Sequence, residues 1–254
     1  MGRAGFGHRV EGLHAVAEAV SSSRVRTLYV ERGRADRHEV VGLIEDVENA
    51  GGVVRTVDDV RTIAETTAPQ GVVADCEPIR YSTLERLVEM TVPAAVLVVD
   101  RLQDPHNLGA VARSAVAAGV PGLVVSDRRA APLSAAAFKA AAGALEHLAV
   151  AVVGSIADAL SRLSGLGLWT VGLEGAGDRS LFGLELLAEP VALVVGGEGR
   201  GLSRLVGERV DVRAHIPMSG PVESLNASVA AALAVFELAR VRDSQGSRRG
   251  DSNP

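Results

Sequence analysis

The sequence predicts an α/β protein in which a mainly parallel sheet, covered by helices on both faces, follows a smaller α/β module. Six short apolar runs recur between residues 94 and 217, and segments with apolar residues at helical spacing lie between them. This alternation is typical of parallel sheets. A similar alternation fills residues 1–78, and a chain of 254 residues, 47% of them hydrophobic, is long enough for two such domains.

The N-terminal module is predicted to alternate helices with strands. Apolar residues at helical spacing predict helices at residues 10–20, 36–50 and 57–67, and a glycine pair ends the second. Apolar, valine-rich runs predict strands at residues 27–30, 53–57 and 70–76. These elements are enough for a small independent domain.

Charge limits the kind of nucleic-acid contact that the chain can make. The formal net charge is −5, which argues against a generally basic binder, so any RNA contact must be local. Arg24, Arg26 and Arg32 cluster around the first strand, and an arginine fork fits phosphate well. We predict an RNA-facing patch here; a solvated charged face is the alternative, because acidic residues outnumber basic ones in this module.

The domain boundary is predicted between Pro78 and Pro93, where two prolines enclose a short helix or linker. The predicted organisation is a first domain at 1–78, a linker at 79–93, a second domain at 94–242 and a disordered polar tail at 243–254.

The larger domain is predicted to place its ligands at three strand ends. Its strands are expected at residues 94–100, 122–127, 147–153, 168–173, 191–197 and 212–217, with helices between them, such as 107–119 and 134–146. Ligands of such sheets usually lie beyond the carboxyl ends of the strands. The loops after Asp100, Gly196 and Ile216 are therefore the informative ones.

The first two loops carry polar residues in unusual settings. In DRLQDPHNLGAVAR, Asn107 can cap the next helix, and Arg113 lies on a helix otherwise built of small apolar residues. Such an arginine either anchors a salt bridge or reaches into a site. In LVVGGEGRGLSRL, the glycines let backbone approach a ligand and Glu198 is the only acid, but the lysine of a phosphate-binding P-loop is missing.

The third loop, IPMSGPVESLNASVA, leads from a strand into an alanine-rich helix. Ser224 and Asn226 can both cap that helix, and the free N–H groups at its start could hold a polar ligand. A well-capped helix packed on the sheet is the alternative interpretation.

Composition excludes several classes of protein. A single cysteine, Cys76, excludes an internal disulfide, and the six histidines lack the spacing of metal ligands. No apolar run reaches the roughly 18 residues of a membrane span, and the N-terminus lacks a signal-peptide core. We expect a cytoplasmic protein without a metal.

Taken together, DPHNLGAVAR, VVGGEGRGLS and IPMSGPVESLNASVA resemble the three motifs of the SpoU family of RNA ribose methyltransferases, part of the SPOUT superfamily. The N-terminal module is similar to the ribosomal-protein-like substrate-binding domain of the family's ribosomal RNA enzymes. The resemblance implies a SPOUT fold with a deep trefoil knot, and a homodimer formed through the C-terminal domain.

The resemblance also implies site residues. S-adenosylmethionine would be held at Gly196, Ile216, Met218 and Leu225. The polar catalytic residues would be Asn107, Arg113, Glu198, Ser224 and Asn226, with Arg113 acting either as the proton acceptor or as a cation that stabilises the alkoxide and pairs with phosphate.

Two stretches depart from the family pattern and bear on the substrate. The family's His-Gln-Gly turn corresponds to Pro69-Gln70-Gly71, and Ala140-Ala141-Ala142 stands where relatives often have a small polar residue. The expected substrate is a guanosine ribose of 23S ribosomal RNA. The alternatives are a transfer RNA ribose, a ribosomal nucleotide whose methylation blocks an antibiotic, a non-catalytic SPOUT-like RNA-binding module, and an unrelated nucleotide-binding α/β protein.

Overall fold

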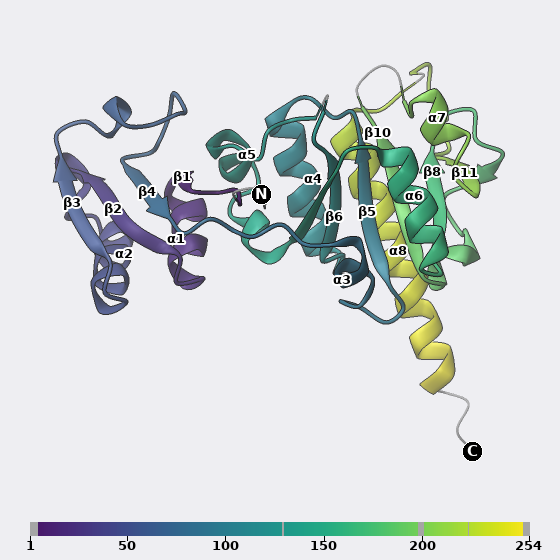
Figure 1. The fold of residues 1–254 in the computed structure, drawn as a ribbon, viewed down its shortest axis with the longest axis horizontal. Helices are drawn as coiled ribbons and strands as arrows, with labels where there is room; N and C mark the ends of the chain where they lie inside the picture. Colours follow the sequence, from purple (N-terminus) through teal and green to yellow (C-terminus); the bar gives the residue numbers. More distant parts are fainter. Residues whose placement is uncertain (1–4, 129, 198–200, 223, 251–254) are drawn as a thin grey trace. The chain divides into compact units, whose positions relative to one another are not determined.

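The computed structural model describes residues 5–128, 130–197, 201–222 and 224–250 (Figure 1). The chain forms two compact units. The first contains residues up to 81 together with 105–113 and 132–147, and the second contains residues 82–104, 114–131 and everything from 148 onward. The larger-domain boundaries expected from sequence, 94–242, therefore include two segments, 105–113 and 132–147, that pack with the N-terminal module.

The first unit is built on a four-stranded sheet in the order β1-β4-β2-β3. Its strands are β1 (Arg9–Glu11), β2 (Val25–Glu31), β3 (Val53–Val57) and β4 (Val72–Cys76), and its helices include α1 (Leu13–Ser21), α2 (His38–Asn49) and α5 (Ala135–Ala140). Only β2 and β3 are parallel. Cys76 is buried, and burial raises the pKa of its thiol to about 12, as expected of an unreactive core residue.

One helix prediction in this unit is confirmed but begins too early, and another is wrong. Residues 9–11 form β1, and α1 begins only after Gly12, whose φ of 88° breaks the helical path. Residues 57–67 contain a single 3-10 turn at Val60–Thr62, because the Asp59 carboxylate bonds the backbone N–H of Arg61 in a local turn.

The turn that departs from the family pattern keeps a structural role. Gln70 has a φ of 62°, and its Oε1 accepts a hydrogen bond from the backbone N–H of Leu13 at 3.2 Å. This bond satisfies one of the free N–H groups at the start of α1. Gln70 therefore fixes the beginning of α1 although proline replaces histidine before it.

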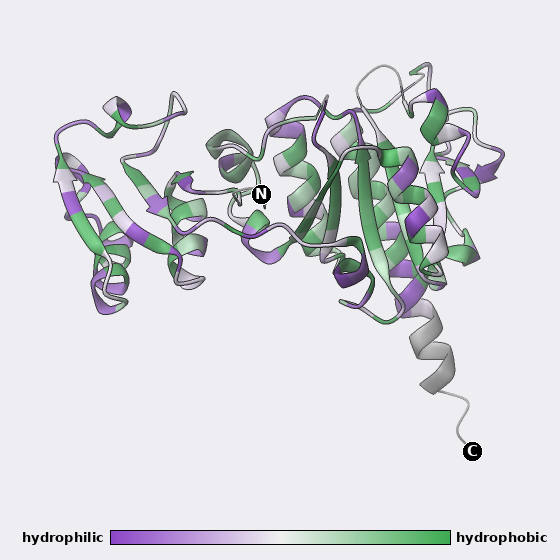
Figure 2. Ribbon diagram, viewed as in Figure 1, coloured by the Kyte–Doolittle hydropathy of each residue, from purple (hydrophilic) through white to green (hydrophobic). Residues whose placement is uncertain are grey.

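The second unit contains a seven-stranded sheet in the order β7-β6-β5-β10-β8-β11-β9. All of its pairings are parallel, as predicted. The strands are β5 (Ala95–Asp100), β6 (Gly122–Ser126), β7 (Ala149–Val153), β8 (Trp169–Leu173), β9 (Arg179–Ser180), β10 (Val191–Gly196) and β11 (Val212–His215). Every residue of β5 and β10 is buried, and Figure 2 shows these central strands as mainly hydrophobic.

Helices cover both faces of this sheet. The helices α3 (Leu84–Val88) and α6 (Ile156–Gly165) pack on one face with α7 (Arg204–Gly207) beside α6, whereas α8 (Ala227–Gly250) lies on the other (Figure 1). The remaining helix, α4 (Pro105–Ala117), connects β5 to β6. Ser155 starts α6, since its side chain accepts from the N–H of Asp158 at 3.2 Å.

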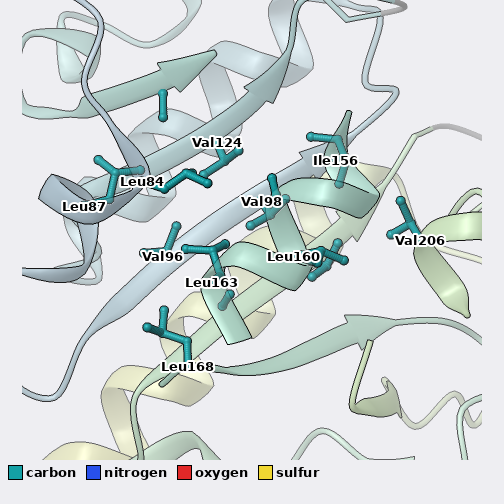
Figure 3. Packing of buried hydrophobic residues seen from close by; sticks show 14 of the residues in the cluster. Leu84, Leu87, Val96, Val98, Val124, Ile156, Leu160, Leu163, Leu168 and Val206 are labelled. Atoms are coloured by element: carbon teal, nitrogen blue, oxygen red, sulfur yellow. The ribbon is translucent and has the colours of Figure 1, made fainter. Parts of the chain in front are cut away.

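The core between α6 and the sheet consists of aliphatic side chains. Ile156, Leu160 and Leu163 recur at i, i+4 and i+7 and are buried among strand valines (Figure 3). Burying each such side chain contributes about 1.5–3 kcal/mol. Leu84 and Leu87 of α3 belong to the same cluster, so residues 84–88 are part of this core and not a linker, which corrects the expectation for 79–93.

The C-terminal helix extends beyond the expected end of the domain. Helix α8 continues to Gly250, so the prediction of a disordered tail is wrong for residues 243–250; residues 251–254 lie outside the described residues. Arg242 anchors the helix through hydrogen bonds to four backbone carbonyls, those of Leu187, Pro93, Ala94 and Glu189. None of the described helices is long and apolar enough to cross a membrane. The knot implied by the resemblance stays a prediction.

Candidate functional site

A cavity of about 320 Å³ lies at the carboxyl ends of β8, β10 and β11. It contains all four predicted cofactor residues, Gly196, Ile216, Met218 and Leu225, together with Ser224. The other described lining residues are Leu173, Glu174, Gly175, Val195, Gly197, Gly201, Ala227 and Ala230. Its position at the strand ends agrees with the general rule for parallel sheets.

The floor of this cavity is made by backbone that tolerates no side chain. A Cβ placed on Gly196 would lie 2.1 Å from the carbonyl carbon of Gly201, and one on Gly197 would lie 2.3 Å from the backbone oxygen of Arg101. Gly197 and Gly201 also form an isolated antiparallel bridge. The glycines therefore let the two ends of the loop meet, and they leave backbone polar groups to bind a ligand.

The start of α8 forms the opposite wall. Asn226 caps this helix: its Oδ1 accepts from the backbone N–H of Ser228 at 2.8 Å and from the Ser228 hydroxyl at 2.6 Å. The cap fixes the preceding backbone, so that Ser224 and Leu225 line the cavity. The predicted capping role of Asn226 is confirmed.

Glu174 is a lining residue that sequence reasoning missed. It is the only charged side chain among the described lining residues, and its Oε2 lies 3.7 Å from Nη1 of Arg213. A carboxylate here can accept hydrogen bonds from ligand hydroxyl or amino groups and complements a cation. Glu174 directly follows β8. A sequence analysis that considered the loop after every predicted strand, and not only three of them, would have found this residue.

Asn107 and Arg113 lie on α4, in the segment that packs with the first unit. The predicted capping role of Asn107 is wrong, because α4 begins at Pro105, where proline is favoured as a first helical residue. Arg113 is exposed. The approach of both side chains to the cavity stays a prediction, and Glu198 lies outside the described residues.

The three predicted RNA-binding arginines have different environments. The Arg24 guanidinium pairs with Glu146 through two hydrogen bonds, and these side chains are only 12% and 1% exposed. Arg24 is therefore committed to the fold, which corrects its assignment to RNA. Arg26 pairs with Glu77, and Arg32 with Asp58 at 2.9 Å, both on the surface, where ion pairs are weak enough to exchange for phosphate.

Among the described residues, no group of histidine, cysteine or acidic side chains could hold a metal ion.

Comparison with known protein families gives two matches that together span most of the chain. Residues 94–236 match the SpoU rRNA Methylase family, and residues 9–82 match the domain described as RNA 2′-O ribose methyltransferase substrate binding.

Individual relatives agree with these matches. A protein of Staphylococcus haemolyticus assigned to the TrmH family of tRNA/rRNA methyltransferases is 34% identical over 93% of this chain and 97% of its own. The crystal structure of the SpoU methyltransferase AviRb from Streptomyces viridochromogenes with AdoMet has a TM-score of 0.77, at 26% identity over 93% of this chain and 90% of that one. The AdoMet-bound rRNA methyltransferase of Sinorhizobium meliloti has a TM-score of 0.75, at 27% identity over 92% and 87%.

Proposed function

The chain belongs to the SpoU rRNA methylase family and is an S-adenosylmethionine-dependent RNA 2′-O-ribose methyltransferase, and we propose that its substrate is a guanosine of 23S ribosomal RNA. The observation that supports a ribosomal substrate is the match of residues 94–236 to the SpoU rRNA methylase family. The cavity at Gly196, Ile216 and Leu225 and the match of the N-terminal unit to an RNA-substrate domain support methyl transfer to RNA.

The residues of the cavity fit S-adenosylmethionine. The volume of about 320 Å³ is within the range of small-molecule sites. Backbone groups at Gly196 and Gly197 can bind the polar edges of the cofactor. The apolar walls of the cavity are supplied by Ile216, Met218 and Leu225, and Glu174 complements a positively charged ligand. When bound, the cofactor supplies an activated methyl group: the ribose oxygen forms a bond to its carbon as the sulfur–carbon bond breaks.

The chain must align the attacking oxygen and assist loss of its proton. A guanidinium keeps its proton at neutral pH in almost every protein. We therefore assign Arg113 the role of a cation that pairs with an RNA phosphate and stabilises the developing alkoxide; proton acceptance is the alternative. Asn107, Ser224, Asn226 and Glu198 are the polar residues that would orient the ribose and the loops.

The N-terminal unit is proposed to select the RNA. The exposed Arg26 and Arg32 are its proposed phosphate contacts, since each is paired only at the surface. RNA is commonly recognised in single-stranded loops and through the 2′-hydroxyl, and a separate reading unit is suited to that task. We place the protein in the cytoplasm, where such RNAs occur.

The enzyme is proposed to act as a homodimer through α8. Val229 and Phe236 are 46% and 52% exposed, and their spacing of seven residues puts them on one face of the helix. Large exposed apolar side chains in a row indicate an interface.

Two other substrates use the same chemistry. A transfer RNA ribose, or a ribosomal ribose whose methylation blocks an antibiotic, would need the same cavity and cofactor. The name of the Staphylococcus haemolyticus relative covers both tRNA and rRNA. A non-catalytic RNA-binding role is disfavoured, because a binding module has no need of a cofactor-sized cavity.

Mapping ribose methylation across ribosomal and transfer RNA, in cells with and without the gene, tests the substrate. We expect one 23S guanosine to lose its methyl group in the deletion strain. Loss at a transfer RNA position, with 23S RNA unchanged, would reject the proposed substrate while leaving the reaction in place.

A further inference from the structure

A second cavity, of about 480 Å³, lies at the carboxyl ends of β5, β6 and β7, in the same unit as the first. Its lining includes residues that follow these strands, the first turn of α6, and α7. The volume is within the range of sites that bind small molecules or single nucleotides. Among the described residues, none of the predicted cofactor or catalytic residues belongs to its lining.

Three arginines and one aspartate are the charged residues of the described lining: Arg101, Arg128, Arg204 and Asp100. The Asp100 carboxylate accepts from the backbone N–H of Ser203 at 2.6 Å and lies 3.6 Å from Nε of Arg101. Its charge is thus compensated by groups inside the fold. Arg128 and Arg204 also line the cavity, and both are exposed.

The pairing of Arg204 does not prevent ligand binding. Arg204 Nη1 lies 2.6 Å from Glu208 Oε1 in an i,i+4 pair, with side chains 78% and 51% exposed. Exposed pairs of this kind stabilise a helix by only about 0.3–0.5 kcal/mol. A phosphate can therefore replace Glu208 at little cost. A positive cavity on a chain of net charge −5 favours an anionic ligand.

One wall of the cavity is apolar and rigid. Ile156 and Val206 belong to the core cluster beneath α6 (Figure 3), whereas the neighbouring Leu205 is 55% exposed. A base can pack on an apolar wall of this kind, while the neighbouring arginines bind its phosphate. The N-terminus of α6, ten residues long, adds backbone N–H groups at the same cavity.

The second cavity lies close to the first. Gly201 lines the first and Ser203 lines the second, and two extended residues span at most about 7 Å. Arg101 Nη2 donates to the backbone oxygen of Gly201 at 3.3 Å, which links the two walls directly. The two sites are therefore close enough to receive neighbouring nucleotides of one strand.

We propose that this second cavity binds a nucleotide of the substrate RNA that flanks the methylated one. Its phosphate would contact Arg128, Arg204 and the N-terminus of α6, and its base would pack on Leu205 and Ile156. This inference rests on the proposed function, because it needs an RNA strand that reaches the cofactor cavity. The second cavity would position the RNA within the catalytic unit, in addition to the RNA selection proposed for the N-terminal unit.

The test compares RNA binding by the full chain and by an R128A/R204A double variant. Fluorescence anisotropy with large-subunit ribosomal RNA fragments and with a labelled single-stranded 12-nucleotide RNA is measured at several salt concentrations. We expect the double variant to bind the RNA at least about tenfold more weakly than the wild type does. The slope of log affinity against log salt should fall by about 0.7, because both arginines contact one phosphate and each lost single-strand phosphate contact removes about 0.7. S-adenosylmethionine affinity, measured by calorimetry, should stay within about twofold.

The control variant is R86A/R162A. These arginines belong to the same unit, are similarly exposed, and pair with Glu89 and Glu85 outside the cavity. Leu205→Ala should also weaken RNA binding but leave the salt slope unchanged, since it removes packing and no charge. A purely structural effect of these substitutions would not change RNA affinity and the salt slope independently of each other.

The possible results separate a failure of the second site from a failure of the proposed function. A double variant that binds RNA with wild-type affinity and salt slope would overturn the second site while the proposed function stands. A double variant that keeps wild-type RNA binding but loses binding of adenosine monophosphate in the same titration would also overturn the second RNA site. That result would identify the cavity as a site for free nucleotides. A wild-type chain that binds S-adenosylmethionine but no RNA would instead overturn both.

Discussion

The carboxylate of Asp100 accepts a hydrogen bond from the backbone N–H of Ser203 at 2.6 Å. This bond joins the end of β5 to the segment that follows the glycine loop, across more than a hundred residues of sequence. Asp100 is only 4% exposed, and a charge-assisted bond to a buried carboxylate is stronger than a neutral one. The contact holds the loop that forms the floor of the cofactor cavity.

Replacing Asp100 by alanine should destabilise the chain and weaken cofactor binding. The partly buried N–H of Ser203 would lose its charged partner, at a cost of about 1.5–3 kcal/mol in unfolding free energy. Urea unfolding and calorimetric titration with S-adenosylmethionine measure the two effects. Asp178→Ala, at an exposed position of the same unit, serves as the control; equal behaviour of the two variants would contradict this role of Asp100.

Gly196→Ala should abolish the close approach on which the cavity depends. The new methyl group would lie 2.1 Å from the carbonyl carbon of Gly201, which is backbone and cannot rotate away. We expect at least about tenfold weaker binding of S-adenosylmethionine, since each tenfold corresponds to about 1.4 kcal/mol. Gly165→Ala, in α6 with open space around its Cα, should leave binding unchanged. Wild-type affinity in Gly196→Ala would show that the loop does not form this floor.

Arg24 and Arg26 lie close in sequence but should respond differently to alanine. Removing Arg24 leaves the Glu146 carboxylate buried without its partner, so the unfolding free energy should fall by about 3–5 kcal/mol. Removing Arg26 should change stability by less than about 1 kcal/mol and reduce RNA affinity. Denaturation and RNA titration of both variants measure these two effects. An Arg24→Ala variant as stable as the wild type would contradict the structural role of Arg24.

Phe236→Arg should separate the proposed dimer. The side chain is 52% exposed on α8, and a charge placed in an apolar interface is costly to bury. Light scattering should give twice the 26.2 kDa chain mass for the wild type and a single chain mass for the variant. Phe182→Arg, at another exposed aromatic residue of the same unit, should remain dimeric. A wild-type monomer with full activity would exclude the dimer.

The sequence predicted the sheet well because buried parallel strands are continuous apolar runs. The runs around Val96, Val124 and Val194 begin and end within a few residues of the observed strands. The cavity residues were also predicted, although through resemblance: backbone contacts leave little signal beyond glycine itself.

Long-range packing was not predictable from local patterns. Phe138 approaches Phe6 with ring centroids 6.0 Å apart, and this helps join residues 132–147 to the first unit. Glu146 pairs with Arg24 across 122 residues, so an arginine that looked available for RNA is a structural one. The spacing of apolar residues along a helix does not indicate which distant segment that helix will contact.

The position of the transferred methyl group tests the central claim most directly. Purified protein is incubated with ribosomal RNA from cells that lack the gene and with S-adenosylmethionine carrying a deuterated methyl group, and the digested nucleosides are analysed by mass spectrometry. We predict the label on the ribose of guanosine, and at least about a hundredfold slower transfer by Arg113→Ala, with substantial rescue by Arg113→Lys if charge alone is needed. Label on a base, or transfer by Arg113→Ala at the wild-type rate, would contradict the account.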